Sequence, residues 1–132
     1  MIQGIINKII TDSTCQTLIG AVGSRYKVYP VVAPQDEPKP YVLLRRTGEF
    51  GATVKNSASE VDQLTVNITA YGETYKTCID ILNAIRVVLE NFKGTEEGIV
   101  YKNIWYANSQ DLFDKDDNSF VIVDTYNARV GR

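Results

Sequence analysis

Residues 63–92 read QLTVNITAYGETYKTCIDILNAIRVVLENF, and this stretch decides the fold. Its first part alternates polar with apolar residues, the apolar set being Leu64, Val66, Ile68 and Ala70. This period of two predicts a half-buried strand in an antiparallel sheet. The second part carries an apolar stripe with helical spacing, formed by Cys78, Ile81, Leu82, Ile85, Val88, Leu89 and Phe92. We expect Thr74 to cap this helix, Gly94 to end it, and the stripe to pack on the sheet.

Upstream of this unit, the segment 28–42 contains all four prolines of the chain. Proline fixes its own φ and lacks a backbone donor, so the segment is expected to be a stiff, non-helical connector into a strand over 41–50. Tyr26, Val28 and Val31 are expected to form a short edge strand, because the prolines forbid a central position. The polar, small-residue run 51–60 predicts a mobile loop at the tip of a long β-hairpin.

The two ends of the chain complete the pattern. Isoleucines with helical spacing over 2–10 predict an amphipathic helix. A second short helix follows, with Asp12 or Ser13 as its N-cap and Gly20 as its end. Strands are expected over 99–106 and 120–129, joined by an acidic turn over 111–119. The fold class is therefore α+β, a single domain over 1–132 in two layers, with an antiparallel sheet of about four strands and helices on one face.

Composition excludes several function classes. The chain has 132 residues, no histidine and a formal net charge of −2, so neither a Ser-His-Asp triad nor general attraction to DNA or anionic membranes is expected. Cys15 and Cys78 lie far apart without a metal-binding spacing, and we expect both to be small buried residues of a reducing compartment. The acidic run 111–117 lacks the glycine and glutamate of a calcium loop. We therefore expect no enzyme activity, cofactor or metal.

No apolar run reaches the roughly 18 residues of a membrane span, and the N-terminal isoleucines are interrupted by polar residues, unlike a signal peptide. A soluble intracellular product is expected. Aromatic residues and arginines then stand out on strands whose inner faces other residues fill, and such residues are enriched where proteins meet proteins. The predicted subunit-interface residues are Tyr29, Pro30, Tyr41, Arg45, Arg46, Tyr71, Tyr101, Trp105 and Tyr126.

The order and spacing of several short motifs resemble a known family over nearly the whole chain. The motifs are the N-terminal helices ending at Leu18-Ile19-Gly20, Tyr29-Pro30, Ala33-Pro34, Pro40-Tyr41-Val42, the strand Leu64–Tyr71 with the helix Glu73–Phe92, Asp111-Leu112-Phe113, and the strand Phe120–Val130. In this arrangement the chain resembles the small tail-completion proteins of tailed bacteriophages, also called tail-terminator or head–tail joining proteins.

The resemblance implies a structural virion protein, made in the bacterial host cytoplasm, that forms a ring at the head–tail junction. Such a ring is expected to be a hexamer, with a dodecamer as the alternative. It would cap the tail tube protein and meet a head-completion, neck or portal-adaptor protein, while genome DNA passes through the lumen without sequence-specific binding. The loops 51–60 and 111–119 would order on assembly. Two other readings stay open, a generic intracellular protein-binding module and a hydrolase that uses carboxylates or a metal.

Overall fold

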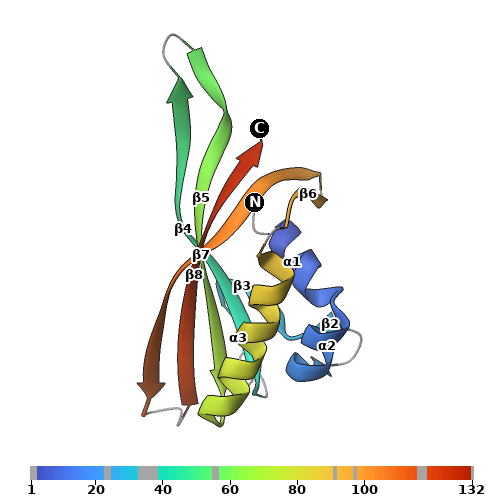
Figure 1. Ribbon diagram of the computed structural model, residues 1–132. Helices are drawn as coiled ribbons and strands as arrows, with labels where there is room; N and C mark the ends of the chain where they lie inside the picture. Colours follow the sequence, from blue (N-terminus) through green and yellow to red (C-terminus); the bar gives the residue numbers. More distant parts are fainter. Residues whose placement is uncertain are drawn as a thin grey trace.

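The computed structural model describes residues 3–22, 25–32, 39–54, 57–90, 92–96, 98–115 and 119–131. Three helices pack beside a strongly twisted sheet (Figure 1). The helices are α1 (Gln3–Ile10), α2 (Ser13–Ile19) and α3 (Tyr75–Leu89). The strands are β1 (Ala21–Val22), β2 (Arg25–Tyr26), β3 (Val28–Pro30), β4 (Tyr41–Val54), β5 (Ser57–Gly72), β6 (Gly94–Glu96), β7 (Ile99–Asp114) and β8 (Ser119–Gly131).

The main sheet has six strands rather than the four expected, in the order β3-β4-β5-β8-β7-β6. Its four long strands, β4, β5, β8 and β7, run antiparallel, as the alternation around Leu64 predicts. The short strand β6 pairs antiparallel with β7 at one edge, and β3 pairs parallel with β4 at the other. Tyr26 lies outside this sheet, because β2 pairs only with β1.

The proline-rich segment is described in part. The edge position predicted from the prolines is confirmed, since β3 is an edge strand that ends at Pro30. Val31, which was expected in this strand, instead follows it with a φ of 67°. The segment 33–38, with Pro34 and Pro38, lies outside the described residues.

Both hairpins are longer than the sequence indicates. The prediction of a loop over 51–60 is wrong for most of these residues, because β4 continues to Val54 and β5 begins at Ser57. Residues 55 and 56 lie outside the described part of the chain. The predicted acidic turn 111–119 is also too long, since β7 extends to Asp114 and pairs there with Ser119. The pairing of backbone groups, rather than an apolar pattern, extends the strands in these regions.

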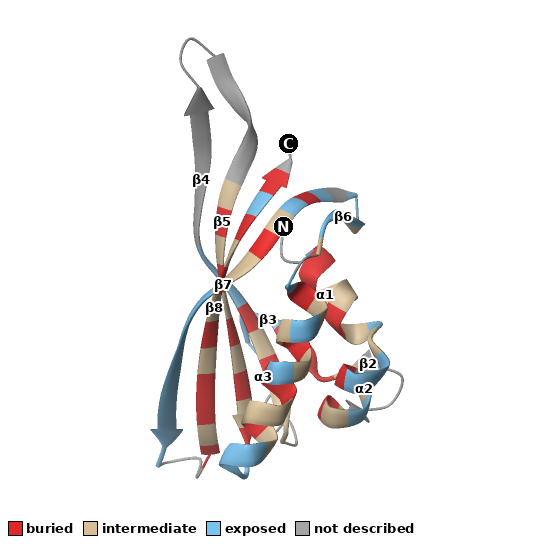
Figure 2. Cartoon of the chain, viewed as in Figure 1, coloured by how far each residue is buried: buried red, intermediate tan, exposed pale blue. Residues whose placement is uncertain are grey.

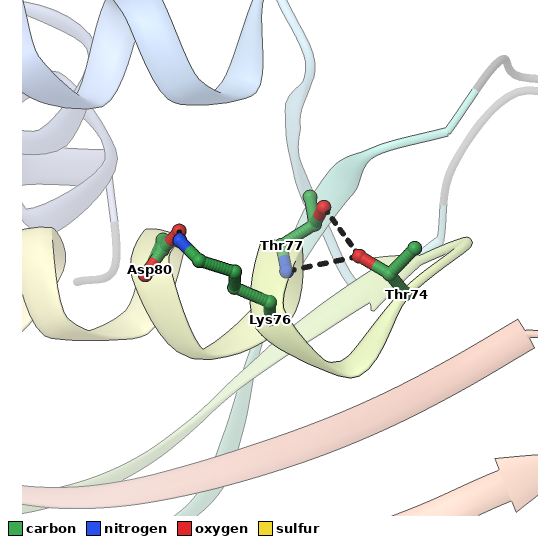
Figure 3. A network of polar contacts seen from close by, with 4 residues as sticks. All are labelled: Thr74, Lys76, Thr77 and Asp80. Atoms are coloured by element: carbon green, nitrogen blue, oxygen red, sulfur yellow. Dashed lines mark hydrogen bonds and ion pairs between the residues drawn. The ribbon is translucent and has the colours of Figure 1, made fainter.

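The helix caps follow the sequence at three of four positions. Asp12 accepts a hydrogen bond from the backbone amide of Cys15 at 3.0 Å, and Gly20 ends α2 with a φ of 80°. Thr74 caps α3 by accepting from the amide of Thr77 at 3.2 Å (Figure 3). The predicted end of α3 at Gly94 is wrong, because the helix stops at Leu89 with Glu90 extended, and Gly94 begins β6.

The hydrophobic core lies between the helices and one face of the sheet (Figure 2). The apolar residues of β5 named above are at most 1% exposed. On α3, the buried stripe is Cys78, Ile81, Leu82, Ile85 and Leu89, while Val88 and, beyond the end of the helix, Phe92 are only partly buried against the core. Each large aliphatic side chain buried here contributes about 1.5–3 kcal/mol before entropy is counted. The strand–helix unit at residues 63–92 thus forms the centre of the core.

Both cysteines are free and buried, as expected. Burial raises the pKa of the Cys15 thiol to about 12 and that of Cys78 to about 11. Because only a thiolate attacks disulfide reagents, we expect neither cysteine of the native protein to react with an aromatic disulfide at pH 8, and both to react in urea. Absorbance of the released thiol measures this. A fast-reacting thiol in the native protein would contradict the burial of Cys15 or Cys78.

Candidate assembly surface

The sheet face turned away from the helices, here called the outer face, is polar and nearly uncharged. On the central strands it consists of Gln63, Thr65, Asn67, Thr69 and Tyr71 of β5 and Val121, Val123, Thr125, Asn127 and Arg129 of β8. These positions alternate with inward-facing buried ones, because successive side chains on a strand point to opposite faces, although Val121 is itself only 7% exposed. Arg129 is the one charged residue among these ten positions, and no carboxylate is present there.

Two reciprocal side-chain pairs hold the centre of the outer face. The hydroxyl of Thr65 donates to the side-chain oxygen of Asn127 at 2.9 Å, and the hydroxyl of Thr125 donates to that of Asn67, also at 2.9 Å. Each threonine faces its asparagine directly across β5 and β8. Such cross-strand pairs stabilise a sheet by about 0.2–1 kcal/mol each. The outer face is therefore an ordered polar surface.

Aromatic and basic side chains flank this polar centre. Tyr41 and Tyr71, which pair across β4 and β5, stack with ring centroids 4.7 Å apart. Trp105 pairs with Asn127 and so shares the outer face, half-buried. Arg45 lies on the outer face and Arg46 on the opposite one, and both are exposed. The sheet thus brings Tyr41, Arg45, Tyr71 and Trp105 to one surface.

Three tyrosines predicted for the subunit interface are instead buried within the chain. Tyr29 is 7% exposed, and Tyr101 and Tyr126 are 1% exposed. Tyr101 fills the space beneath α1, where an added Cβ on Gly4 would come within 2.6 Å of its ring. The prediction that Tyr101 and Tyr126 lie outside the core is therefore wrong. Pro30, another predicted interface residue, is exposed at the β3 edge.

A buried charge lies between α3 and the sheet. Asp124 on β8 is 2% exposed, and its carboxylate lies 3.9 Å from the guanidinium of Arg86 on α3. The guanidinium also lies over the ring of Tyr106, 3.8 Å from the centroid. Burial raises the pKa of Asp124, while a hydrogen bond with Ser109 and the charge of Arg86 oppose that shift. The charge of Arg86 thus offsets part of the cost of burying the Asp124 carboxylate beneath α3.

Two groups of exposed apolar side chains were missed by the sequence analysis. Val31 and Val32, 62% and 72% exposed, follow the edge strand β3. Leu112 and Phe113 at the end of β7, with Tyr75 at the start of α3, are 46–49% exposed. Tyr75 also donates its hydroxyl to Asp111 at 2.9 Å. In the sequence, Leu112 and Phe113 are apolar residues inside a polar stretch, and this pattern could have indicated the second group.

The described part of the chain offers little for chemistry. It contains no group of three or more cysteine, aspartate or glutamate side chains placed to hold a metal ion. An open depression of about 300 Å³ on α2 is lined by Ser13, Thr14, Thr17 and Leu18, none of which is charged. No helix among the described residues is long and apolar enough to cross a membrane.

In the part of the chain that the structure describes, one sheet face carries no helix and two apolar groups are exposed, which is typical of a subunit that other proteins cover. The chain belongs to the family of tail completion proteins described as "Tail completion protein gp17", whose model matches residues 3–131. It is thus a structural protein of a phage-type tail, located in the virion. This confirms the resemblance drawn from the motifs.

The fold is also that of a solved virion component. One chain of the structure titled "Virion of native gene transfer agent (GTA) particle" superposes with a TM-score of 0.76 at 17% sequence identity. The match covers 98% of this chain and 92% of that one. At this identity the likeness establishes the fold alone. No curated protein matches the sequence significantly.

Proposed function

We propose that the chain forms a closed homo-oligomeric ring at the head–tail junction, where it caps the tail tube and joins it to the head connector. A hexamer is the expected ring and a dodecamer the alternative. The whole chain acts as one assembly unit with a structural, non-catalytic role, and the genome passes through the ring without sequence-specific contacts. Membership of the tail completion family supports this proposal.

The proposal of a ring rests on one observation, the two separate groups of exposed apolar side chains. A ring closes through heterologous contacts, so each subunit needs two different adhesive surfaces. The two exposed apolar groups lie toward opposite edges of the sheet, Val31 and Val32 after β3 and Leu112 and Phe113 on β7. Exposed apolar groups at two separate places favour a head-to-tail contact over a two-fold dimer, which would use one surface twice. The flanking residues Tyr41, Arg45, Arg46, Tyr71, Trp105 and Pro30 remain proposed interface residues.

Native mass spectrometry and negative-stain electron microscopy test this function. The purified chain, alone or mixed with its own tail tube and neck proteins, should form a ring of one size, six subunits being expected. The matching genetic experiment removes the gene from the virus and should leave heads and tails unjoined. A chain that stays monomeric with both partners at micromolar concentration would contradict the proposed function.

A further inference from the structure

We propose that neighbouring subunits join edge to edge, with the free edge of β7 in one copy pairing antiparallel with the free edge of β4 in the next. This inference rests on the proposed ring and names the contact that closes it. Its partner is a second copy of the same chain, recognised by backbone hydrogen bonding and charge.

Two long strands have an unpaired side. The strand β3 pairs with β4 only at Val42, Leu43 and Leu44, so no described strand pairs with this side of β4 from Arg45 to Val54. The strand β6 pairs with β7 only at residues 99–101, so the described part of the chain leaves β7 unpaired on that side from Lys102 to Asp114. An open edge of this length presents a row of backbone donors and acceptors that another strand can satisfy.

The two free edges match in position along the sheet. Across the paired strands, Arg46 of β4 lies level with Val66, Tyr126 and Tyr106. Each free edge carries a β-bulge beside this same rung, at Thr47 in β4 and at Ala107 in β7. A bulge increases the local twist, so bulges at one level let two joined edges twist together. The strand β3 already pairs with the first residues of β4, and β6 already pairs with the first residues of β7. The two short strands therefore lie at opposite ends of the region in which the two edges can pair.

Charge selects the direction of pairing. The free edge of β4 begins with the exposed residues Arg45 and Arg46, and that of β7 ends in the segment that holds Asp111 and Asp114, also exposed. Antiparallel pairing places the start of the free β4 edge toward the end of β7, so the arginines and the aspartates lie toward the same end of the joined edges. Parallel pairing would place the arginines beside Lys102 instead. Antiparallel pairing also continues the alternation of β4, β5, β8 and β7, and it keeps the helices of every copy on one side.

Disulfide cross-linking tests the contact in the full-length chain. Thr47→Cys or Arg45→Cys is combined with Asn108→Cys or Trp105→Cys, giving four double variants, and each is oxidised under conditions that form the ring. Residues directly opposite on antiparallel strands have Cβ atoms about 5 Å apart, within reach of a disulfide. We expect at least one pair to give a ladder of covalent multimers on a non-reducing gel, ending at the ring size. The native Cys15 and Cys78 are buried and do not interfere.

Matched controls separate the possible results. Thr14→Cys combined with Asn83→Cys places two exposed thiols on helices away from both edges and should give no ladder. Single variants should stay monomeric on the gel. A covalent dimer of a single variant would mean that β4 of one copy lies beside β4 of another, or β7 beside β7, rather than β7 beside β4. A melting temperature near that of wild type identifies the double variants that fold.

A ring seen by native mass spectrometry without a ladder from any folded edge pair would overturn the edge contact and leave the ring standing. Cross-links to the tube protein alone would overturn it as well. A chain that forms no ring with its tail partners would contradict the proposed function itself.

Discussion

Ile85→Asp is expected to abolish cooperative folding, whereas Val87→Asp, two residues along the same helix, should leave it intact. Ile85 is 0% exposed in the stripe by which α3 packs on the sheet, and Val87 is 80% exposed. Both changes replace a β-branched side chain by aspartate, so their effects on helix propensity are similar. The difference between them therefore measures burial.

The expected loss is large because an unpaired carboxylate cannot be hydrated at Ile85. Burying the carboxyl group, charged or protonated, and losing the packing of Ile85 together cost several kcal/mol, which is comparable to the about 5–15 kcal/mol by which a domain is usually stable. Circular dichroism melts of the two variants measure the effect. A cooperative melt of Ile85→Asp within a few degrees of wild type would show that α3 does not pack on the sheet by this face. Unfolding by Val87→Asp as well would show that the exposed face of α3 is misplaced.

The sequence predicts this central unit well, because two periodic patterns follow each other without a break. The alternation at Leu64–Ala70 identifies both the strand and its buried face, and the caps at Asp12 and Thr74 need only local chemistry. These features depend on residues close together in the chain. The family resemblance depends on the spacing of such local motifs, and for this reason the sequence alone was enough to detect it.

Strand ends and sheet edges were harder to predict. The residues of β4 and β5 near the hairpin tip have no apolar alternation, and they become strands because each pairs with the other. The parallel pairing of β3 with β4 joins segments separated by prolines, and no periodicity marks it. Such pairings are decided by tertiary structure rather than by the propensity of single residues.

The buried tyrosines show two different reasons for failure. Tyr126 is separated from the buried residues Ile122 and Val130 by even numbers, so alternation alone places it in the core. Tyr101 and Ile104 are both buried although they are three residues apart. A bulge between Tyr101 and Asn103 absorbs the extra residue. Bulges change which face a side chain joins, and the sequence does not reveal where they occur.

Arg86→Ala is expected to destabilise the fold by about 3 kcal/mol, whereas Lys76→Ala changes stability by less than about 0.5 kcal/mol. The ion pair of Lys76 with Asp80 is the shorter one, 2.8 Å against 3.9 Å (Figure 3). The side chains of Lys76 and Asp80 are 85% and 40% exposed, however, so solvent screens them, whereas the side chain of Asp124 is only 3% exposed. Removing Arg86 leaves a buried carboxylate without its nearest positive charge and also removes the contact with the Tyr106 ring.

Asp124→Asn in the Arg86→Ala background distinguishes charge from packing. If the loss is electrostatic, the neutral amide restores much of the stability. Urea unfolding of the wild type, the two single variants and the double variant gives the coupling energy directly. Because the pKa of Asp124 is already raised and rises further without Arg86, its ionised form opposes folding above that pKa. The destabilisation by Arg86→Ala should therefore shrink as the pH falls from 7 toward 4. A loss that is independent of pH and is not relieved by Asp124→Asn would mean that Arg86 acts only by covering the sheet with its side chain.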